Sequence, residues 1–128
     1  MKVLLDTHVF LWWVTNRDLL SQAARQIIGD GGNDLFFSAG SAWEIATKTR
    51  LGKLRLSDDL EGFIAEQLTL NAFQPLPIHV SHALHVYSLP DHHRDPFDRI
   101  LIAQAQLENL SILSADPLMS QYDVRVLW

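Results

Sequence analysis

The sequence predicts an α/β fold, a single domain in which helices cover both faces of a mostly parallel β-sheet. Short apolar runs alternate along the chain with longer segments of helical periodicity, the pattern typical of successive β–α–β units. The 128 residues suit one domain, taken here as residues 1–128, and 48% of them are hydrophobic. A chain of this size can bury a sizeable core.

The first third of the chain predicts two strands and two helices. Residues 2–5 (KVLL) and 35–38 (LFFS) are short apolar runs, as expected of buried strands. Residues 8–14 (HVFLWWV) are apolar nearly all round, which predicts a helix covered on more than one side. Ser21 is expected to cap a further helix, which closes at Gly29.

The middle of the chain predicts helices and one edge strand. Ser41 is expected to cap a helix that stops at Gly52, and Ser57 to cap the next one. Residues 73–78 (FQPLPI) contain two prolines, so they can form only an edge strand or an extended segment. A further helix is predicted over residues 81–89.

The last third predicts a helix followed by two strands. The helix runs over residues 96–108 and ends at Asn109, a residue that tolerates the left-handed conformation of a helix stop. Residues 110–114 (LSILS) are a third buried strand, and residues 124–128 (VRVLW) a last one.

Composition excludes several classes of protein. The chain has no cysteine, which rules out disulfides and thiolate metal sites. No run reaches the ~20 apolar residues of a membrane span, and Asp6 interrupts the apolar start of the chain, so we expect a cytoplasmic protein without a membrane partner. The formal net charge of −5 does not by itself suggest a nucleic-acid partner.

Four acids are expected to meet at one edge of the sheet. Asp6 ends the first strand, and Glu44 and Asp98 lie near the starts of helices. From Asp98, in the first turn of its helix, the helix travels roughly 16 Å, and the strand after it returns by roughly 17 to 20 Å, which brings Asp116 back to the same edge. Open α/β sheets bind their ligands at this edge.

Clustered carboxylates predict a bound cation. Like charges a few ångströms apart resist ionisation, and a hard cation such as Mg²⁺ or Mn²⁺ neutralises them. An ion held in this way can activate water and stabilise charge on a phosphate. The four acids, Asp6, Glu44, Asp98 and Asp116, are therefore candidate metal ligands and catalytic residues for phosphodiester hydrolysis.

Each acid also has a purely structural alternative. Ser41 and Glu44 match the capping box of a helix start. Asp95-Pro96-Phe97-Asp98 matches an acidic cap with Pro at the first helical position, followed by a charge that the helix dipole favours. Of the two aspartates, Asp95 is expected to be the cap and Asp98 the ligand. Asp116-Pro117 is compatible with a plain turn. The shared edge favours the catalytic interpretation for the set.

Four segments give the chain a family resemblance. The stretches LLDTH, SAWEIATK, HRDPFDRILIAQA and LSAD occur in the order and spacing of PIN-domain ribonucleases, and the chain most resembles the VapC toxins of prokaryotic toxin–antitoxin systems. The resemblance covers essentially the whole chain. It implies a parallel sheet flanked by helices, a Mg²⁺ (or Mn²⁺) site, an RNA substrate, a homodimer and a cognate antitoxin protein.

The resemblance also assigns roles to residues. Asp6, Glu44 and Asp98 match the three central acids of the family, and Asp116 matches its more variable fourth acid. Ser114 lies where the family often has a Thr or Ser near the site.

The sequence contains other polar and aromatic clusters besides the acids. Lys48, Arg50, Lys53 and Arg55 form a basic stretch suited either to RNA or to the end of a helix. His79, His82 and His85 would spread too widely around a helix for one ordinary zinc face. Arg94 and Arg99 flank the two aspartates. Trp12 and Trp13 are adjacent, so one either faces a partner or is buried on a second side of its helix.

Two other functions remain as alternatives. A phosphoacceptor receiver domain of similar size also places carboxylates at the edge of its sheet. Receivers need paired acids after the first strand and a Lys after the last, and this chain has Asp-Thr-His and no such Lys. A catalytically dead PIN-like binding module is disfavoured only because all four acids are present.

Overall fold

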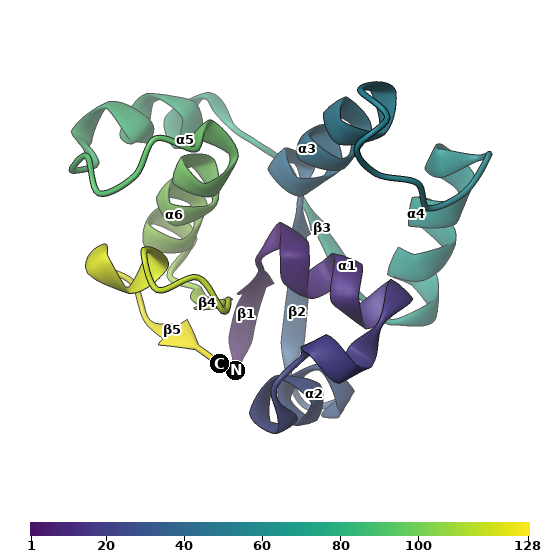
Figure 1. The fold of residues 1–128 in the computed structure, drawn as a ribbon. Coiled ribbons are helices and arrows are strands. Elements are labelled where there is room, and N and C mark those ends of the chain that lie inside the picture. Colours follow the sequence, from purple (N-terminus) through teal and green to yellow (C-terminus); the bar gives the residue numbers. More distant parts are fainter.

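The computed structural model describes residues 1–128 and contains a single five-stranded parallel sheet with helices on both faces (Figure 1). The elements, in chain order, are β1 (Lys2–Leu5), α1 (Thr7–Thr15), η1 (Arg17–Leu19), α2 (Gln22–Gly29), β2 (Asp34–Ser38), α3 (Ala39–Arg50), α4 (Leu60–Leu70), β3 (Gln74–Leu76), α5 (Val80–His85), η2 (Val86–Ser88), α6 (Pro96–Glu108), β4 (Ser111–Leu113), η3 (Met119–Gln121) and β5 (Val126–Leu127). The predicted fold class is confirmed.

The strand order β3-β2-β1-β4-β5 places β1 at the centre of the sheet. The chain first adds β2 and β3 on one side of β1, then crosses over to add β4 and β5 on the other. The direction of winding therefore reverses between β1 and β4. In open α/β sheets this reversal opens a crevice at the carboxyl ends of the two strands, where Asp6 and Ser114 follow β1 and β4.

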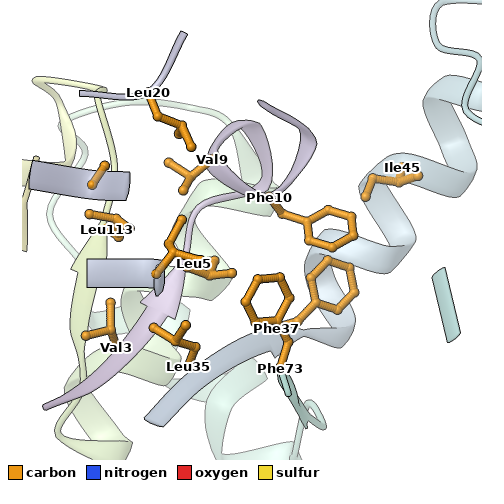
Figure 2. Close-up of a cluster of buried hydrophobic side chains, with 12 residues drawn as sticks. Val3, Leu5, Val9, Phe10, Leu20, Leu35, Phe37, Ile45, Phe73 and Leu113 are labelled. Carbon is orange, nitrogen blue, oxygen red and sulfur yellow. The ribbon is translucent and has the colours of Figure 1, made fainter. Parts of the chain in front are cut away.

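The alternation of side chains along β1 divides the core into two parts. Val3 and Leu5 point to one face, where α1 and α2 cover the sheet and Phe10 packs against Phe37 (Figures 1 and 2). Leu4 points to the other face, where α6 covers it. All three side chains are fully buried, as the short apolar run predicted.

The helix α1 is covered on more than one side, as predicted. Trp13 donates its indole N–H to Asn71 at 2.9 Å, and the Arg17 guanidinium lies 3.6 Å from the centre of its ring. Trp12 lies beside Trp128, with ring centres 6.0 Å apart. Both tryptophans therefore have partners within the chain, and both keep part of their surface exposed.

The starts of two helices were predicted wrongly. Ser38, not Ser41, is the N-cap of α3, and its hydroxyl accepts from the Gly40 N–H at 2.9 Å. Ser41 lies inside the helix, where its hydroxyl accepts from Thr7. Asp59, not Ser57, caps α4 through the Gly62 N–H. In both cases several residues with capping side chains lie close together, and periodicity alone did not separate them.

The segment predicted as one helix over residues 81–89 is instead α5 followed by the 3₁₀ turn η2. Other boundaries agree with the sequence, including β3 as an edge strand and the left-handed Asn109 at the end of α6. Every helix is too short or too polar to cross a lipid bilayer.

Two contacts fix α3 against α6 near the carboxyl edge of the sheet. A Cβ atom at Gly40 would lie 2.8 Å from the Ile100 side chain, so only glycine allows the two helices to approach this closely. The buried Gln104 of α6 joins Ser38 at 2.5 Å and donates to the Pro77 carbonyl at 3.1 Å. These contacts determine how far apart Glu44 and Asp98 lie.

Candidate metal centre

Asp6 lies at the bottom of the crevice and is only 4% exposed. It occupies the N-cap position of α1, but its carboxylate caps no backbone amide. One oxygen, Oδ2, accepts from the Ser114 hydroxyl at 2.6 Å, and Oδ1 has no hydrogen-bond partner. Burial raises the pKa of Asp6 above its ordinary value, and the Ser114 hydrogen bond opposes this rise.

Glu44 enters the same crevice from the second turn of α3, not from a capping box, since the helix begins three residues earlier than predicted. It is 2% exposed. Its Oε2 pairs with the Lys48 ammonium at 2.5 Å, while Oε1 is buried without a partner. The hydrogen bond to Glu44 raises the pKa of Lys48. Lys48 therefore neutralises one acid of the cluster.

Asp98 lies in the first turn of α6, and the predicted division between it and Asp95 has a structural basis. The Asp95 carboxylate caps the helix by accepting from the Phe97 and Asp98 amides at 2.9 and 3.4 Å, with Pro96 at the first helical position. The Asp98 carboxylate makes no such bond and faces the other acids.

The pKa of Asp98 is raised to about 8. Burial is the largest cause, and the charges of Asp6, Asp95, Glu44 and Asp116 follow in that order. The three other predicted acids thus lie close enough to Asp98 to oppose its ionisation.

Asp116 follows β4 and is held by a backbone hydrogen bond in the turn after that strand. Its Oδ1 accepts from the Leu118 amide at 2.9 Å, and its own amide donates to the Ser114 hydroxyl at 3.0 Å. Ser114 therefore connects Asp116 to Asp6. The turn predicted as the structural alternative is present, and Asp116 also belongs to the acid cluster.

His93 is the member of the site that the sequence did not predict. One ligand atom each from His93, Asp98 and Asp116 lie within 4.8 Å of one another. The side chain of His93 is 7% exposed, and its Nε2 is buried without a hydrogen-bond partner. The only signal for His93 in the sequence is its position immediately before Arg94 and Asp95.

The donors in this crevice fit a hard divalent cation. Asp6 Oδ1 and Glu44 Oε1 are buried acceptors with no donor in reach, an arrangement that is unfavourable unless a cation or ordered water satisfies them. Carboxylate oxygens are the donors that Mg²⁺ and Mn²⁺ prefer. Asp6, Glu44, Asp98 and Asp116 are the residues that could hold the ion.

A small pocket opens beside these acids. Its volume is about 300 Å³, and Asp6, His8, Trp12, Ala115 and Asp116 line it. The crevice therefore offers an indole and an imidazole next to two of the carboxylates. A larger cavity of about 650 Å³ lies at the opposite end of β4 and contains none of the four acids.

The other polar clusters have structural explanations. His82 is fully buried between the His79 amide and Glu108, and His85 joins Gln106, so these histidines connect α5 to α6. Arg99 donates to four backbone carbonyls, those of Val86, Leu89, Pro90 and His93.

The basic stretch is partly engaged as well. Lys48 is held by Glu44, and Arg55 pairs with Asp58 at 3.0 Å on the surface. Of the two arginines that flank the aspartates, Arg94 is exposed and Arg99 is not. Of the basic residues that lie near the acids in the sequence, Arg50, Lys53 and Arg94 are therefore exposed and available to bind RNA.

The fold and the acid cluster together are those of a known class of protein domain. Residues 3–125 match the family model of the PIN domain, and the chain belongs to the PIN domain family. The resemblance noted in the sequence is confirmed, and the receiver-domain alternative is wrong.

Individual relatives narrow the comparison. Over 61 residues the chain is 34% identical to ribonuclease VapC16 of Mycobacterium tuberculosis (strain ATCC 25618 / H37Rv), a match covering 48% of this chain and 43% of that protein. The chain thus matches less than half the length of this relative.

Solved structures share the fold at low sequence identity. VapBC2 from Rickettsia felis, bound to a DNA fragment from its promoter, has a TM-score of 0.73 at 9% identity, over 99% of this chain and 98% of that one. FitAcB from Neisseria gonorrhoeae has a TM-score of 0.66 at 21% identity, over 98% and 96%. VapBC-1 from nontypeable Haemophilus influenzae has a TM-score of 0.67 at 18% identity, over 99% and 97%.

Proposed function

We propose that this protein is a Mg²⁺- or Mn²⁺-dependent endoribonuclease and the toxin of a toxin–antitoxin pair. The observation that carries the proposal is the pair of buried, unpartnered carboxylate oxygens, Asp6 Oδ1 and Glu44 Oε1, within a cluster of four acids. Membership in the PIN domain family and similarity to a protein named as a ribonuclease support it.

The four acids hold the ion, and the neighbouring residues hold the acids. Ser114 orients Asp6 through a 2.6 Å hydrogen bond, and Asp95 keeps the first turn of α6 in place below Asp98. The bound ion supplies activation of a water molecule and stabilisation of the charge on the attacked phosphate. Lys48 balances the charge of Glu44, which lowers the repulsion within the cluster.

A single-stranded RNA substrate suits the pocket beside the acids. Trp12 and His8 line it together with Asp6 and Asp116. Aromatic side chains next to a reacting phosphate offer a surface on which an unpaired base can stack, a contact worth about 1–3 kcal/mol per base. Because the net charge is −5, we expect the pocket and the metal, rather than a broad basic surface, to provide most of the RNA affinity.

Cleavage is expected to require the metal and Asp6. Purified protein should cleave a pool of structured RNAs in the presence of Mg²⁺ or Mn²⁺ and should stop when EDTA is added. Asp6→Asn should remove the activity and leave the fold intact, since the amide fits the space but supplies no charge. Sequencing of the RNA ends measures both effects.

The matched control is Asp123→Asn, an exposed acid outside the cluster, which should cleave like the wild type. Undiminished cleavage in excess chelator, from a preparation free of contaminating nuclease, would show that the metal has no role. A folded wild-type protein that binds metal but cleaves no RNA would support the catalytically dead alternative.

A cognate antitoxin and a homodimer are the proposed partners. The similar structures include VapBC2, VapBC-1 and FitAcB, and α1 keeps partly exposed apolar side chains, among them Leu11 and Trp12. We expect the protein to co-purify with the product of the neighbouring gene and to run as a dimer in size-exclusion chromatography. A strict monomer at high concentration that does not bind that product would contradict both assignments.

A further inference from the structure

His93 lies beside the acid cluster in the loop between η2 and α6. Its Nε2 is 3.6 Å from Asp98 Oδ2 and has no hydrogen-bond partner, although the side chain is 93% buried (7% exposed). A buried imidazole nitrogen that faces a carboxylate can either donate a proton to it or offer a lone pair to a metal ion. The contacts on the other side of the ring distinguish these two possibilities.

The Tyr122 hydroxyl determines which nitrogen of His93 carries the proton. The phenol is buried, and three groups reach its oxygen: the Arg99 guanidinium at 3.2 Å, the His93 backbone amide at 3.3 Å and the His93 Nδ1 at 3.0 Å. The guanidinium and the amide can only donate, so together they occupy the acceptor positions of the phenol oxygen. The hydroxyl proton is left for Nδ1.

Because Nδ1 accepts a hydrogen bond, a neutral His93 carries its proton on Nε2. That proton points toward the carboxylate of Asp98. A nitrogen that carries a proton has no lone pair for a metal ion, so His93 does not belong to the ligand set even though it lies within 4.8 Å of two candidate ligands.

We propose that His93 is a positioning residue, which orients the Asp98 carboxylate through its Nε2–H while Tyr122 and Arg99 fix its tautomer. The inference rests on the proposed function, in that it takes Asp98 as a metal ligand. Carboxylates that bind metals are themselves commonly held by hydrogen bonds, and loss of such a partner weakens metal binding by roughly 10- to 100-fold. The 3.6 Å separation is longer than a hydrogen bond, and such contacts tighten in the loaded state.

Nitrogen NMR of the histidine rings tests the tautomer directly. In the wild type, with and without Mg²⁺, His93 should show the Nε2–H form. Tyr122→Phe removes the donor to Nδ1, and His93 should then populate both tautomers. An Nδ1–H form in the wild type would overturn the proposal, and so would ¹⁴N coupling from His93 in the electron paramagnetic resonance spectrum of the Mn²⁺-loaded protein.

Metal affinity tests the role of the contact. His93→Leu should weaken Mn²⁺ binding, measured by calorimetry, by roughly 10-fold. His93→Gln keeps an N–H donor near the position of Nε2 and should bind within about 3-fold of the wild type, which a purely packing role would not predict. Equal Mn²⁺ affinity in the Leu variant and the wild type would contradict the proposal.

These readouts need no RNA, so they separate the two proposals. A wild type that cleaves RNA but has the Nδ1–H tautomer would contradict the role of His93 and leave the proposed function in place. A protein with the Nε2–H tautomer and the stated affinities but without RNA cleavage would support the role of His93 and contradict the proposed function. If His93→Leu fails to fold, the tautomer and the His93→Gln affinity still decide the question.

Discussion

Replacement of Asp98 by Asn is expected to abolish RNA cleavage, whereas replacement of Asp95 by Ser is expected to preserve most of it. The two aspartates lie three residues apart but do different things. Asp98 contributes charge to the acid cluster, and its pKa responds to all three other acids. Asn keeps the size of the side chain and removes the charge, so we expect a loss of roughly 10²-fold or more.

Asp95 provides the comparison within the same turn. Its carboxylate accepts from the Phe97 and Asp98 amides, and a Ser hydroxyl can accept in the same way. Asp95→Ser should therefore lower the stability by under about 1 kcal/mol. Both variants are assayed beside the wild type for RNA cleavage and Mg²⁺ binding. If a normally folded Asp95→Ser is as inactive as Asp98→Asn, then Asp95 belongs to the active site.

The metal-free protein is expected to lose stability as the pH rises from about 4 to about 8. The pKa of Asp98 is about 8 in the folded chain, against an ordinary value of 3.8. The folded state therefore holds a proton that the unfolded state releases in this range, and stability falls with rising pH. Since one pKa unit corresponds to about 1.4 kcal/mol, the effect is on the order of a few kcal/mol.

Removal of the Asp98 carboxylate should remove this dependence of stability on pH. Asp98→Asn should melt roughly 10 °C higher than the wild type at pH 8 without metal, and the difference should shrink or reverse in millimolar Mg²⁺, which stabilises only the intact site. Differential scanning calorimetry at pH 5 and pH 8 measures both effects, with Asp123→Asn as the control. A metal-free Asp98→Asn that is clearly less stable than the wild type would show that Asp98 is chiefly structural.

The sequence predicted most of the fold because its signals are local and repeated. Two elements carry independent local signals at their ends. β1 is an apolar run that stops at Asp6, and α6 starts at Asp-Pro and ends at Asn. Each lies within a residue or two of its predicted place. At the start of α3 the signals competed. Ser38 and Ser41 are both good caps, and the choice depended on Thr7, a partner 34 residues away that binds the Ser41 hydroxyl.

The sequence predicted the four acids of the candidate site, but it did not predict the environments of His93 and Arg99. The four acids follow from the direction of each strand and helix, which fixes the edge at which each residue lies. The environments of His93 and Arg99 do not follow from it, because both depend on Tyr122, at least 23 positions away in the chain. Arg99 flanks the two aspartates in the sequence, but its guanidinium donates to carbonyls of the preceding loop.

The close approach of α3 and α6 at Gly40 has a consequence for the size of ion that the site accommodates. Glu44 lies one turn beyond Gly40, and Asp98 lies two residues before Ile100, so both acids are attached close to the point where the two helices meet. Mg²⁺ requires oxygens at about 2.0–2.1 Å, whereas Ca²⁺ takes them at about 2.3–2.6 Å. Under the proposed function, this close approach of the two helices is expected to favour Mg²⁺ over the larger Ca²⁺.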